Sequence, residues 1–227
     1  MTPLLEAREI RKAFDGDRVL DGVTLSLAPG EAVGLIGPNG SGKTTLIDIL
    51  SGLTKPDAGT VGFEGREIGG LPMDARYRAG IARTFQVPSP YPALSVLEAV
   101  LVPMAAASQR GRRGGAGEEE EPALALLRRV GLFDQRCVPC ARLSQGCLRR
   151  LELARALACR PRVLLLDEIF SALSASDEAE LVALLATSNR EDGTAFLLVS
   201  HNPPLLASTC GRILTLKGGR ISRERAV

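Results

Sequence analysis

The sequence predicts an α/β fold built around a mostly parallel β-sheet. Short apolar runs alternate with amphipathic stretches along the 227 residues, as is typical of α/β proteins. Two of these runs, residues 163–166 and 195–199, show little alternation between apolar and polar positions, which indicates strands covered on both faces. Residues 19–27 do alternate and end at the turn Ala28-Pro29-Gly30, so an antiparallel pair of strands is expected to open the fold.

The other elements follow in order along the chain. Residues 32–36 form a short apolar run and are predicted to be a buried strand. Residues 44–51 continue as a helix, which Gly52 is expected to close. Helices are also predicted over 148–158 and 177–185, each in front of one of the two buried strands named above.

The stretch 148–158 has the pattern of a helix that packs on one face. Its apolar positions, expected to face the core, are Leu148, Leu151, Ala154 and Ala158. Its charged positions, expected to point away from the core, are Arg149, Arg150 and Glu152.

Composition excludes several classes of protein. Hydrophobic residues make up 45% of the chain, which is enough for a sizeable core and argues against global disorder. The net charge of +2 argues against a dedicated nucleic-acid binder, and no nucleic-acid partner is expected. Charged residues interrupt the N-terminal stretch, so no signal peptide is expected, and no uncharged apolar run approaches the roughly 20 residues that span a bilayer. The chain is predicted to be soluble or peripheral to a membrane.

The five cysteines are predicted to be reduced thiols, because their number is odd and no secretion signal is visible. Cys137 and Cys140 have CxxC spacing, and Cys147 follows soon after. A zinc site requires four ligands, and the only histidine has a better explanation elsewhere. Incidental spacing is therefore favoured over a zinc site.

Residues 87–135 differ from the rest of the chain, since they carry several prolines and then apolar helical stretches. The helical stretches are split by residues 108–121, a low-complexity segment with a basic block followed by an acidic one. A solvated loop is the favoured interpretation of this segment, and a charged docking site is the alternative.

A glycine-rich segment directly follows one predicted strand and directly precedes one predicted helix. It matches the pattern G-x-x-x-x-G-K-[ST] with the residues Gly37, Pro38, Asn39, Gly40, Ser41, Gly42, Lys43 and Thr44, and Thr45 comes next. Glycines let backbone N–H groups curl around phosphates, and the helix N-terminus adds partial positive charge. Lys43 is expected to reach the β- and γ-phosphates of a bound nucleotide, and Thr44 to place its hydroxyl on Mg²⁺.

Polar side chains end other predicted strands, and ligands of open α/β sheets gather at the C-terminal strand ends. Asp167 and Glu168 end the strand 163–166; Asp167 is predicted to hold Mg²⁺, and Glu168 to orient the attacking water as a general base. His201 follows the strand 195–199 and is predicted to be a polar contact or charge stabiliser near the γ-phosphate. Gln86 closes residues 81–86 and is predicted to contact the metal or the lytic water.

The motifs follow one another in a fixed order: the P-loop, Gln86, the segment Leu143-Ser144-Gln145-Gly146-Cys147, the Asp167-Glu168 pair and His201. This order resembles the motif series of ABC ATPases. The resemblance runs from about Phe14 to Gly219. It implies one ABC ATPase domain over residues 1–227, a P-loop NTPase with a mostly parallel central sheet, an N-terminal antiparallel β subdomain and an inserted α-helical subdomain. The implied catalytic core and β subdomain cover 1–86 and 155–227, and the helical subdomain, which contains the signature, covers about 87–154.

The resemblance also implies roles for single positions. Phe14 resembles the aromatic residue that stacks on adenine, and Gln86 the residue that senses nucleotide and couples to the membrane subunit. Ser144 and Gly146 resemble the signature that completes the nucleotide site of a partner subunit. Residues 172–174 resemble the D-loop at the dimer seam, and His201 the H-loop switch.

Finer patterns resemble the ATP-binding subunits of branched-chain amino acid importers, and related urea importers share much of them. These patterns are Gly80-Ile-Ala-Arg83-Thr84-Phe85-Gln86, Tyr91-Pro-Ala-Leu-Ser-Val-Leu-Glu98 and the residues 149–157 after the signature. The implied partners are transmembrane permease subunits, a second ATP-binding subunit in a homo- or heterodimer, and, indirectly, a periplasmic or extracellular solute-binding protein. The implied location is the cytoplasmic face of the cell membrane, with the chain held there peripherally.

Three positions depart from the family pattern. Cys147 stands where the signature ends in glutamine, Ile169 replaces the proline after the catalytic glutamate, and Ser174 replaces the aspartate or asparagine of the D-loop. They are expected to weaken, in turn, the contact with the partner's nucleotide, the turn after Glu168 and hydrogen bonding across the seam. ATP binding is expected to be intact and hydrolysis to be present, and whether hydrolysis is slowed stays open.

Two other functions compete with that of a transport ATPase. A soluble ABC protein of DNA repair or translation usually carries two cassettes or a long coiled-coil insertion, and 227 residues hold one cassette. A catalytically silent regulatory subunit is favoured by the three departures and disfavoured by the intact Glu168.

Overall fold

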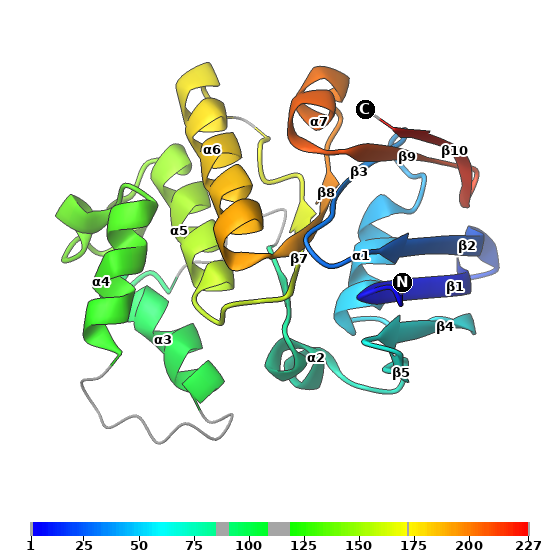
Figure 1. Cartoon of the computed structure of the whole chain (residues 1–227), viewed down its shortest axis with the longest axis horizontal. Coiled ribbons are helices and arrows are strands. Elements are labelled where there is room, and N and C mark those ends of the chain that lie inside the picture. Colours follow the sequence, from blue (N-terminus) through cyan, green and yellow to red (C-terminus); the bar gives the residue numbers. More distant parts are fainter. Residues whose placement is uncertain (1, 85–90, 109–118, 172, 227) are drawn as a thin grey trace.

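A six-stranded sheet runs through the centre of the computed structural model, which describes residues 2–84, 91–108, 119–171 and 173–226 (Figure 1). Its strand order is β10-β9-β3-β8-β7-β6, and neighbouring strands are parallel except for β9 and β10. The strands are β3 (Ala32–Ile36), β6 (Ile81–Arg83), β7 (Val163–Asp167), β8 (Ala195–Val199), β9 (Arg212–Lys217) and β10 (Arg220–Ala226). All ten residues of β7 and β8 are buried, which explains their unbroken apolar sequences and confirms both predicted strands.

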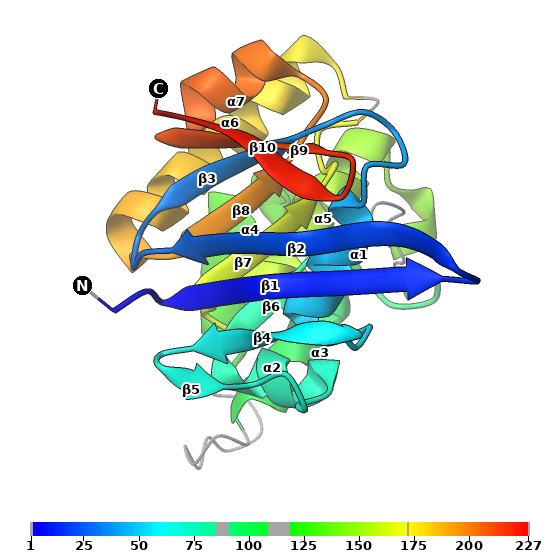
Figure 2. The same cartoon turned by 90° about the vertical axis from the view of Figure 1, so that its right-hand side faces the viewer.

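A second sheet, antiparallel throughout, comes mostly from the N-terminal part of the chain (Figure 2). It has the order β2-β1-β4-β5 and consists of β1 (Leu5–Phe14), β2 (Asp17–Leu27), β4 (Ala58–Phe63) and β5 (Arg66–Glu67). The predicted opening pair is confirmed as β1 and β2. Helix α1 (Lys43–Ser51) shares one hydrophobic core with both sheets, to which it contributes Leu46, Ile47, Ile49 and Leu50.

Helices cover the other face of the central sheet. Helices α5 (Gln145–Leu157), α6 (Ala175–Asp192) and α7 (Pro203–Thr209) pack on β7 and β8 in a second apolar cluster. Helix α5 also belongs to a third cluster, with α3 (Val96–Ser108) and α4 (Glu120–Arg129), and these helices lie on the opposite side of the molecule from the antiparallel sheet (Figure 1). Short 3₁₀ turns at Phe133–Gln135 and Cys140–Arg142 lead into α5. The proposed subdomain boundaries at residues 87 and 154 remain predictions.

Helix α5 corrects one prediction about charged side chains. Arg149 and Glu152 do not point away from the core but are buried, with exposed fractions of 6% and 8%. They form an ion pair of 3.1 Å, and Arg149 also donates a hydrogen bond of 3.1 Å to the Ser171 hydroxyl. Burial is possible because the two opposite charges, three residues apart, neutralise each other within the helix.

Both predicted helices after residue 140 are longer than expected. Helix α5 begins at Gln145 because the Ser144 hydroxyl caps it by accepting a hydrogen bond from the Cys147 amide. Helix α6 runs on to Asp192 and ends at Gly193, which adopts the left-handed conformation with φ 66°. Helix α1 ends at Gly52 as predicted, with φ 84°.

Helix α2 (Met73–Ala79) contributes an arginine that is buried without a carboxylate among the hydrogen-bond acceptors described. Arg76 is fully buried, and its guanidinium donates to the carbonyls of Ile49 and Leu50 at 2.7 and 3.0 Å. It donates in addition to the carbonyls of Leu71 and Gly69 at 3.0 and 3.1 Å. Arg76 therefore adds donors to carbonyl groups at the end of α1, where the Ile49 carbonyl also accepts a hydrogen bond of 3.2 Å from the Gly52 amide. Burial lowers the pKa of Arg76 to about 10.

Within the described ranges, no helix combines the length and the apolar character needed to cross a membrane.

Candidate ATP-binding site

A cavity of about 650 Å³ lies at the C-terminal ends of the parallel strands. Three parts of the chain that the sequence predicts to act together line it: the loop between β3 and α1, the end of β7, and the residue two positions after β8. Its lining residues are Val19, Asn39, Gly40, Gly42, Lys43, Thr44, Thr45, Glu168 and His201. The fold thus brings most of the predicted phosphate and hydrolysis residues to one place.

Two glycines of the loop are required by close packing. A Cβ atom on Gly37 would lie 2.3 Å from the carbonyl oxygen of Leu216 in β9. Gly42 has φ 98°, and a Cβ there would lie 2.7 Å from the Leu20 side chain of β2. The loop therefore fits between β9 and β2 only without side chains at these positions.

Lys43 lies folded over the loop that precedes it. Its Nζ donates hydrogen bonds to the carbonyls of Gly37 and Pro38 at 2.9 and 3.0 Å, and the residue is 6% exposed. Burial lowers the pKa of Lys43, while the carboxylates of Glu168 and Asp167 pull that pKa upward. The ammonium is thus held at the cavity by polar groups that a phosphate oxygen could replace.

Asp167 is a buried carboxylate, 1% exposed, at the end of β7. Among the described residues neither of its oxygens has a hydrogen-bond partner of good geometry, and the same holds for the nearby loop hydroxyl of Ser41. Burial raises the pKa of the Asp167 carboxyl, and the Thr44 hydroxyl and the Arg83 guanidinium act in the opposite direction. A buried carboxylate and the Thr44 hydroxyl are oxygen donors of the kind that Mg²⁺ prefers, so the residues present fit this ion.

Glu168 and His201 lie next to each other in the lining of the cavity. The His201 Nε2 lies 2.6 Å from the Glu168 Oε1. Glu168 has the left-handed backbone conformation, with φ 50°, and its amide donates to the Val199 carbonyl of β8 at 3.2 Å. This unusual backbone turns the side chain from the strand end toward the cavity, where a general base would be required.

Phe14 and Gln86, which the resemblance assigns to the nucleotide site, are not among the described residues that line the cavity. Phe14 is 47% exposed at the end of β1, with the Lys12 Nζ 5.3 Å from its ring centroid, and it is absent from the cavity lining. Val19 of β2 lines the cavity instead, and a single apolar residue in an alternating strand gave no sequence signal for this. Gln86 lies outside the described residues.

Sequence reasoning also missed the contacts that fix the cavity walls. Arg83, at the end of β6, is paired with Asp48 of α1 at 2.6 Å, and its side chain is 4% exposed. The next residue, Thr84, accepts a hydrogen bond of 3.4 Å from the Asp167 amide through its hydroxyl. The end of β6 therefore joins the P-loop helix to the acidic end of β7.

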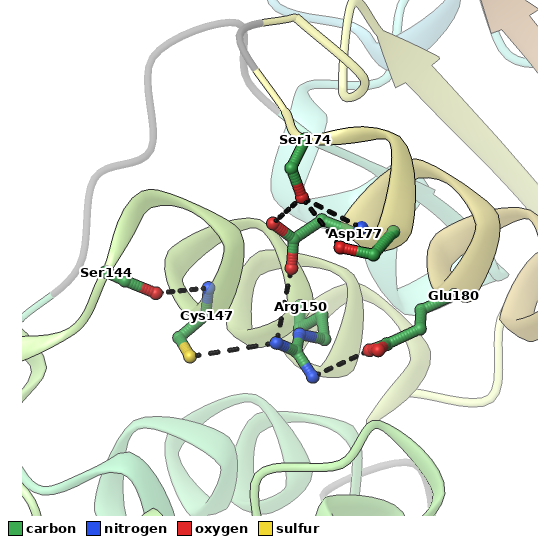
Figure 3. Close-up of polar contacts among 7 residues, drawn as sticks. Ser144, Cys147, Arg150, Ser174, Asp177 and Glu180 are labelled. Carbon is green, nitrogen blue, oxygen red and sulfur yellow. Dashed lines mark hydrogen bonds and ion pairs between the residues drawn. The ribbon is translucent and has the colours of Figure 1, made fainter.

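The signature residues Ser144 and Gly146 do not line this cavity. Ser144 lies at the start of α5, next to the start of α6 (Figure 3), and Gly146 of α5 faces the Asp177 carboxylate of α6. Cys147 is 7% exposed and packs in the third apolar cluster. Ser174 caps α6 by accepting a hydrogen bond from the Asp177 amide at 3.2 Å, and Ile169 is fully buried.

The thiols form no metal centre in the part of the chain that is described, where no three His, Cys, Asp or Glu residues are grouped so that they could hold an ion. Cys137 is exposed, whereas Cys140 is buried.

The family model described as "ABC transporter" matches residues 20–171. The chain belongs to the ABC transporter family. The signature, P-loop and acidic pair described above all lie inside the matched range, so the fold is that of an ABC ATPase cassette.

Curated relatives of this cassette serve several transport systems. It is 38% identical to the lipoprotein-releasing system ATP-binding protein LolD 1 of Caulobacter vibrioides, over 98% of this chain and 96% of that protein. It is 33% identical to the branched-chain amino acid transport ATP-binding protein LivG of Escherichia coli K12, over 96% of this chain and 89% of that protein. It is 36% identical to the methionine import ATP-binding protein MetN of Brucella abortus and spans 60% of that protein's length.

Solved ABC cassettes have the same fold. The ADP conformation of the cassette MJ1267 gives a TM-score of 0.89 at 28% identity and covers all of this chain and 92% of that one. A dimeric post-hydrolysis state of the cassette MJ0796, bound to ADP and Pi, gives a TM-score of 0.87 at 29% identity and covers 98% of both chains.

Proposed function

We propose that this chain binds Mg-ATP, hydrolyses it, and thereby powers an ABC importer of branched-chain amino acids or related small amides. The observation that carries the proposal is the cavity itself, where the P-loop, Glu168 and His201 meet. The importer subclass is supported by the motif around Arg83 and by the similarity to LivG. The similarities to LolD and MetN support transport in general, without favouring one substrate.

Each residue has a task in this proposal. Lys43 exchanges its two carbonyl bonds for oxygens of the β- and γ-phosphates, and the loop amides with the α1 N-terminus bind the rest of the phosphate chain. Thr44 and Asp167, with Gln86, would hold Mg²⁺, which when bound neutralises phosphate charge. Glu168 accepts a proton from the attacking water, and His201, already 2.6 Å from it, fixes the carboxylate orientation.

The proposed assembly contains two such chains, or this chain and a second ATPase, bound to permease subunits at the cytoplasmic face of the membrane. A solute-binding protein would reach the complex through the permeases. The absence of Ser144 and Gly146 from the cavity lining is what a dimer would require if the signature of one subunit completed the ATP site of the other. The dimeric MJ0796 cassette supports this arrangement.

The experiment is Mg-ATP hydrolysis by the purified chain, with ATP-dependent dimers followed by size-exclusion chromatography and light scattering. Lys43→Ala is expected to abolish ATP binding, and Glu168→Gln to bind ATP and accumulate as a dimer. Glu178→Gln is the matched control, because Glu178 lies with Glu168 and His201 on an adjoining cavity of about 260 Å³ but has no proposed catalytic task. Hydrolysis by Glu168→Gln at the wild-type rate would refute the assignment of the base.

A second function is favoured by the departures at Cys147, Ile169 and Ser174. In this alternative the chain is an ATP-binding regulatory or weakly active subunit of a heteromeric complex. Wild-type chain that binds ATP but neither hydrolyses it nor dimerises would support this alternative over the motor.

A further inference from the structure

The N-termini of α5 and α6 are joined through one guanidinium (Figure 3). Arg150 of α5 donates to the Glu180 carboxylate at 2.8 Å and to the Asp177 carboxylate at 3.4 Å, both on α6. Its Nη2 also lies 3.9 Å from the Cys147 sulfur, so the arginine contacts the end of the signature segment as well. The Arg150 side chain is only 16% exposed, and that of Asp177 is 26% exposed. At this burial an ion pair is screened less than a surface pair is.

Asp177 contacts the signature backbone directly. A Cβ atom on Gly146 would lie 2.6 Å from the Asp177 Oδ1, so the carboxylate occupies the space in front of this glycine. A movement of Asp177 toward α5 would therefore push on the signature backbone, because the carboxylate already occupies the place that a side chain on Gly146 would take.

Asp177 is in turn fixed to the segment that follows the catalytic acids. The Ser174 hydroxyl donates to the Asp177 Oδ2 at 2.7 Å and accepts from the Asp177 amide at 3.2 Å. Ser174 lies six positions after Glu168 in the sequence. A displacement of the chain after Glu168 thus has a short path to the signature, through Ser174, Asp177 and Arg150.

We propose that Arg150 is a positioning residue that, together with Asp177, holds residues 144–147 against the start of α6. The position of the signature in one subunit then depends on the chain that follows Glu168 in the same subunit. The signature itself acts on the ATP that the partner subunit binds. The inference rests on the ATP-dependent dimer of the proposed function. Two of the departures from the family pattern, Cys147 and Ser174, lie in this contact network and leave the Arg150–Asp177 pair intact.

The test uses two variants that are each inactive alone. Chain X carries Lys43→Ala and keeps its signature; chain Y carries Ser144→Arg and keeps its P-loop. Only the mixed dimer has a working site, made of the Y P-loop and the X signature. Arg150→Gln is then placed in X or in Y, and Mg-ATP hydrolysis of the mixture is measured as Y is titrated with X.

Arg150→Gln is expected to reduce hydrolysis about tenfold when it is in X and less than about twofold when it is in Y. Arg150→Lys in X is expected to recover part of the activity, because an ammonium can still pair with Asp177 but lacks the guanidinium fork that reaches Glu180 at the same time. The matched control is Arg129→Gln in X: Arg129 ties α4 to α6 through Asp192 at 2.8 Å, away from the signature, and its loss is expected to leave hydrolysis unchanged. Melting temperatures of all variants verify that the chains are folded.

An equal loss with Arg150→Gln in X and in Y would show a general structural role and overturn the proposal, as would no loss in X. The mixture without Arg150→Gln is measured first, beside the wild type. A wild type that forms no ATP-dependent dimer refutes the proposed function, whereas an active mixture that is insensitive to Arg150 refutes only the positioning role.

Discussion

Replacing Arg76 by methionine is expected to be one of the most destabilising single changes in this cassette. Methionine keeps an unbranched stem but has no donors, so the carbonyls of Ile49, Leu50, Gly69 and Leu71 would all lose the guanidinium. They have little access to replacement water, because the Arg76 site is fully buried.

The magnitude follows from those four contacts. At about 1 kcal/mol for each net hydrogen bond, the free energy of unfolding falls by about 4 kcal/mol. For a chain of this size about 1 kcal/mol corresponds to roughly 2–4 °C in Tm, so the expected decrease in Tm is roughly 8–16 °C. Helix α1 begins at Lys43, and loosening its other end is also expected to weaken ATP binding.

The assay is urea unfolding followed by far-UV circular dichroism, since the chain has no tryptophan to report on unfolding by fluorescence. The control is Arg78→Met on the same helix, which removes an exposed ion pair with Asp74 and is expected to cost less than about 0.5 kcal/mol. A loss below about 1 kcal/mol for Arg76→Met would refute the reasoning, because it would mean that the four carbonyls find other partners.

Three further changes test the cavity. Gly42→Ala is expected to lower the free energy of unfolding by about 2 kcal/mol in thermal unfolding and to abolish ATP binding, since a Cβ would meet Leu20. Gly40→Ala, with open space around the added Cβ, is expected to lower it by less. Asp167→Asn is expected to raise the nucleotide-free stability at pH 7 by about 1 kcal/mol while abolishing hydrolysis. Burial raises the pKa of Asp167, so the folded chain binds this proton more tightly than the unfolded chain. The free-energy cost of the buried charge is absent below the ordinary pKa of 3.8 and grows as pH rises through the folded pKa. A gain in stability from Asp167→Asn that persists at pH 3 would therefore contradict this account. Arg83→Gln breaks the buried pair with Asp48 and is expected to lower the free energy of unfolding by about 3 kcal/mol. It is also expected to weaken binding of a fluorescent ATP analogue. Affinity equal to that of wild type would show that β6 does not support the P-loop.

The parts of the fold that sequence predicts well are those in which a local pattern has one structural meaning. Strands β3 and β8 could be predicted to the residue because an apolar run bounded by turns and polar residues has few other uses. The P-loop could be predicted because its glycines and lysine stand between a strand and a helix. In both cases the deciding contacts lie within a short stretch of chain.

The predictions failed where a distant segment decides the environment of a residue. Arg149 and Glu152 have the sequence of a solvated helix face, and segments far away in the chain, Ser171 among them, pack beside α5 and make that face an interior one. Arg76 gave no signal, because its acceptors come from two separate stretches, 49–50 and 69–71. Val19 reaches the cavity because Gly42 packs against β2, a contact that no local pattern encodes.

The strand order of the central sheet also constrains when the cassette can assemble during synthesis. Strand β3, which leads into the P-loop, has β8 and β9 as its two neighbours, and neither emerges from the ribosome until the chain has passed Ala195. The antiparallel sheet, by contrast, is complete in sequence by Glu67. The nascent chain therefore carries an early β-ribbon and an apolar, unpaired β3 through most of its translation, a state in which chaperones can bind and from which the ATP site forms only at the end.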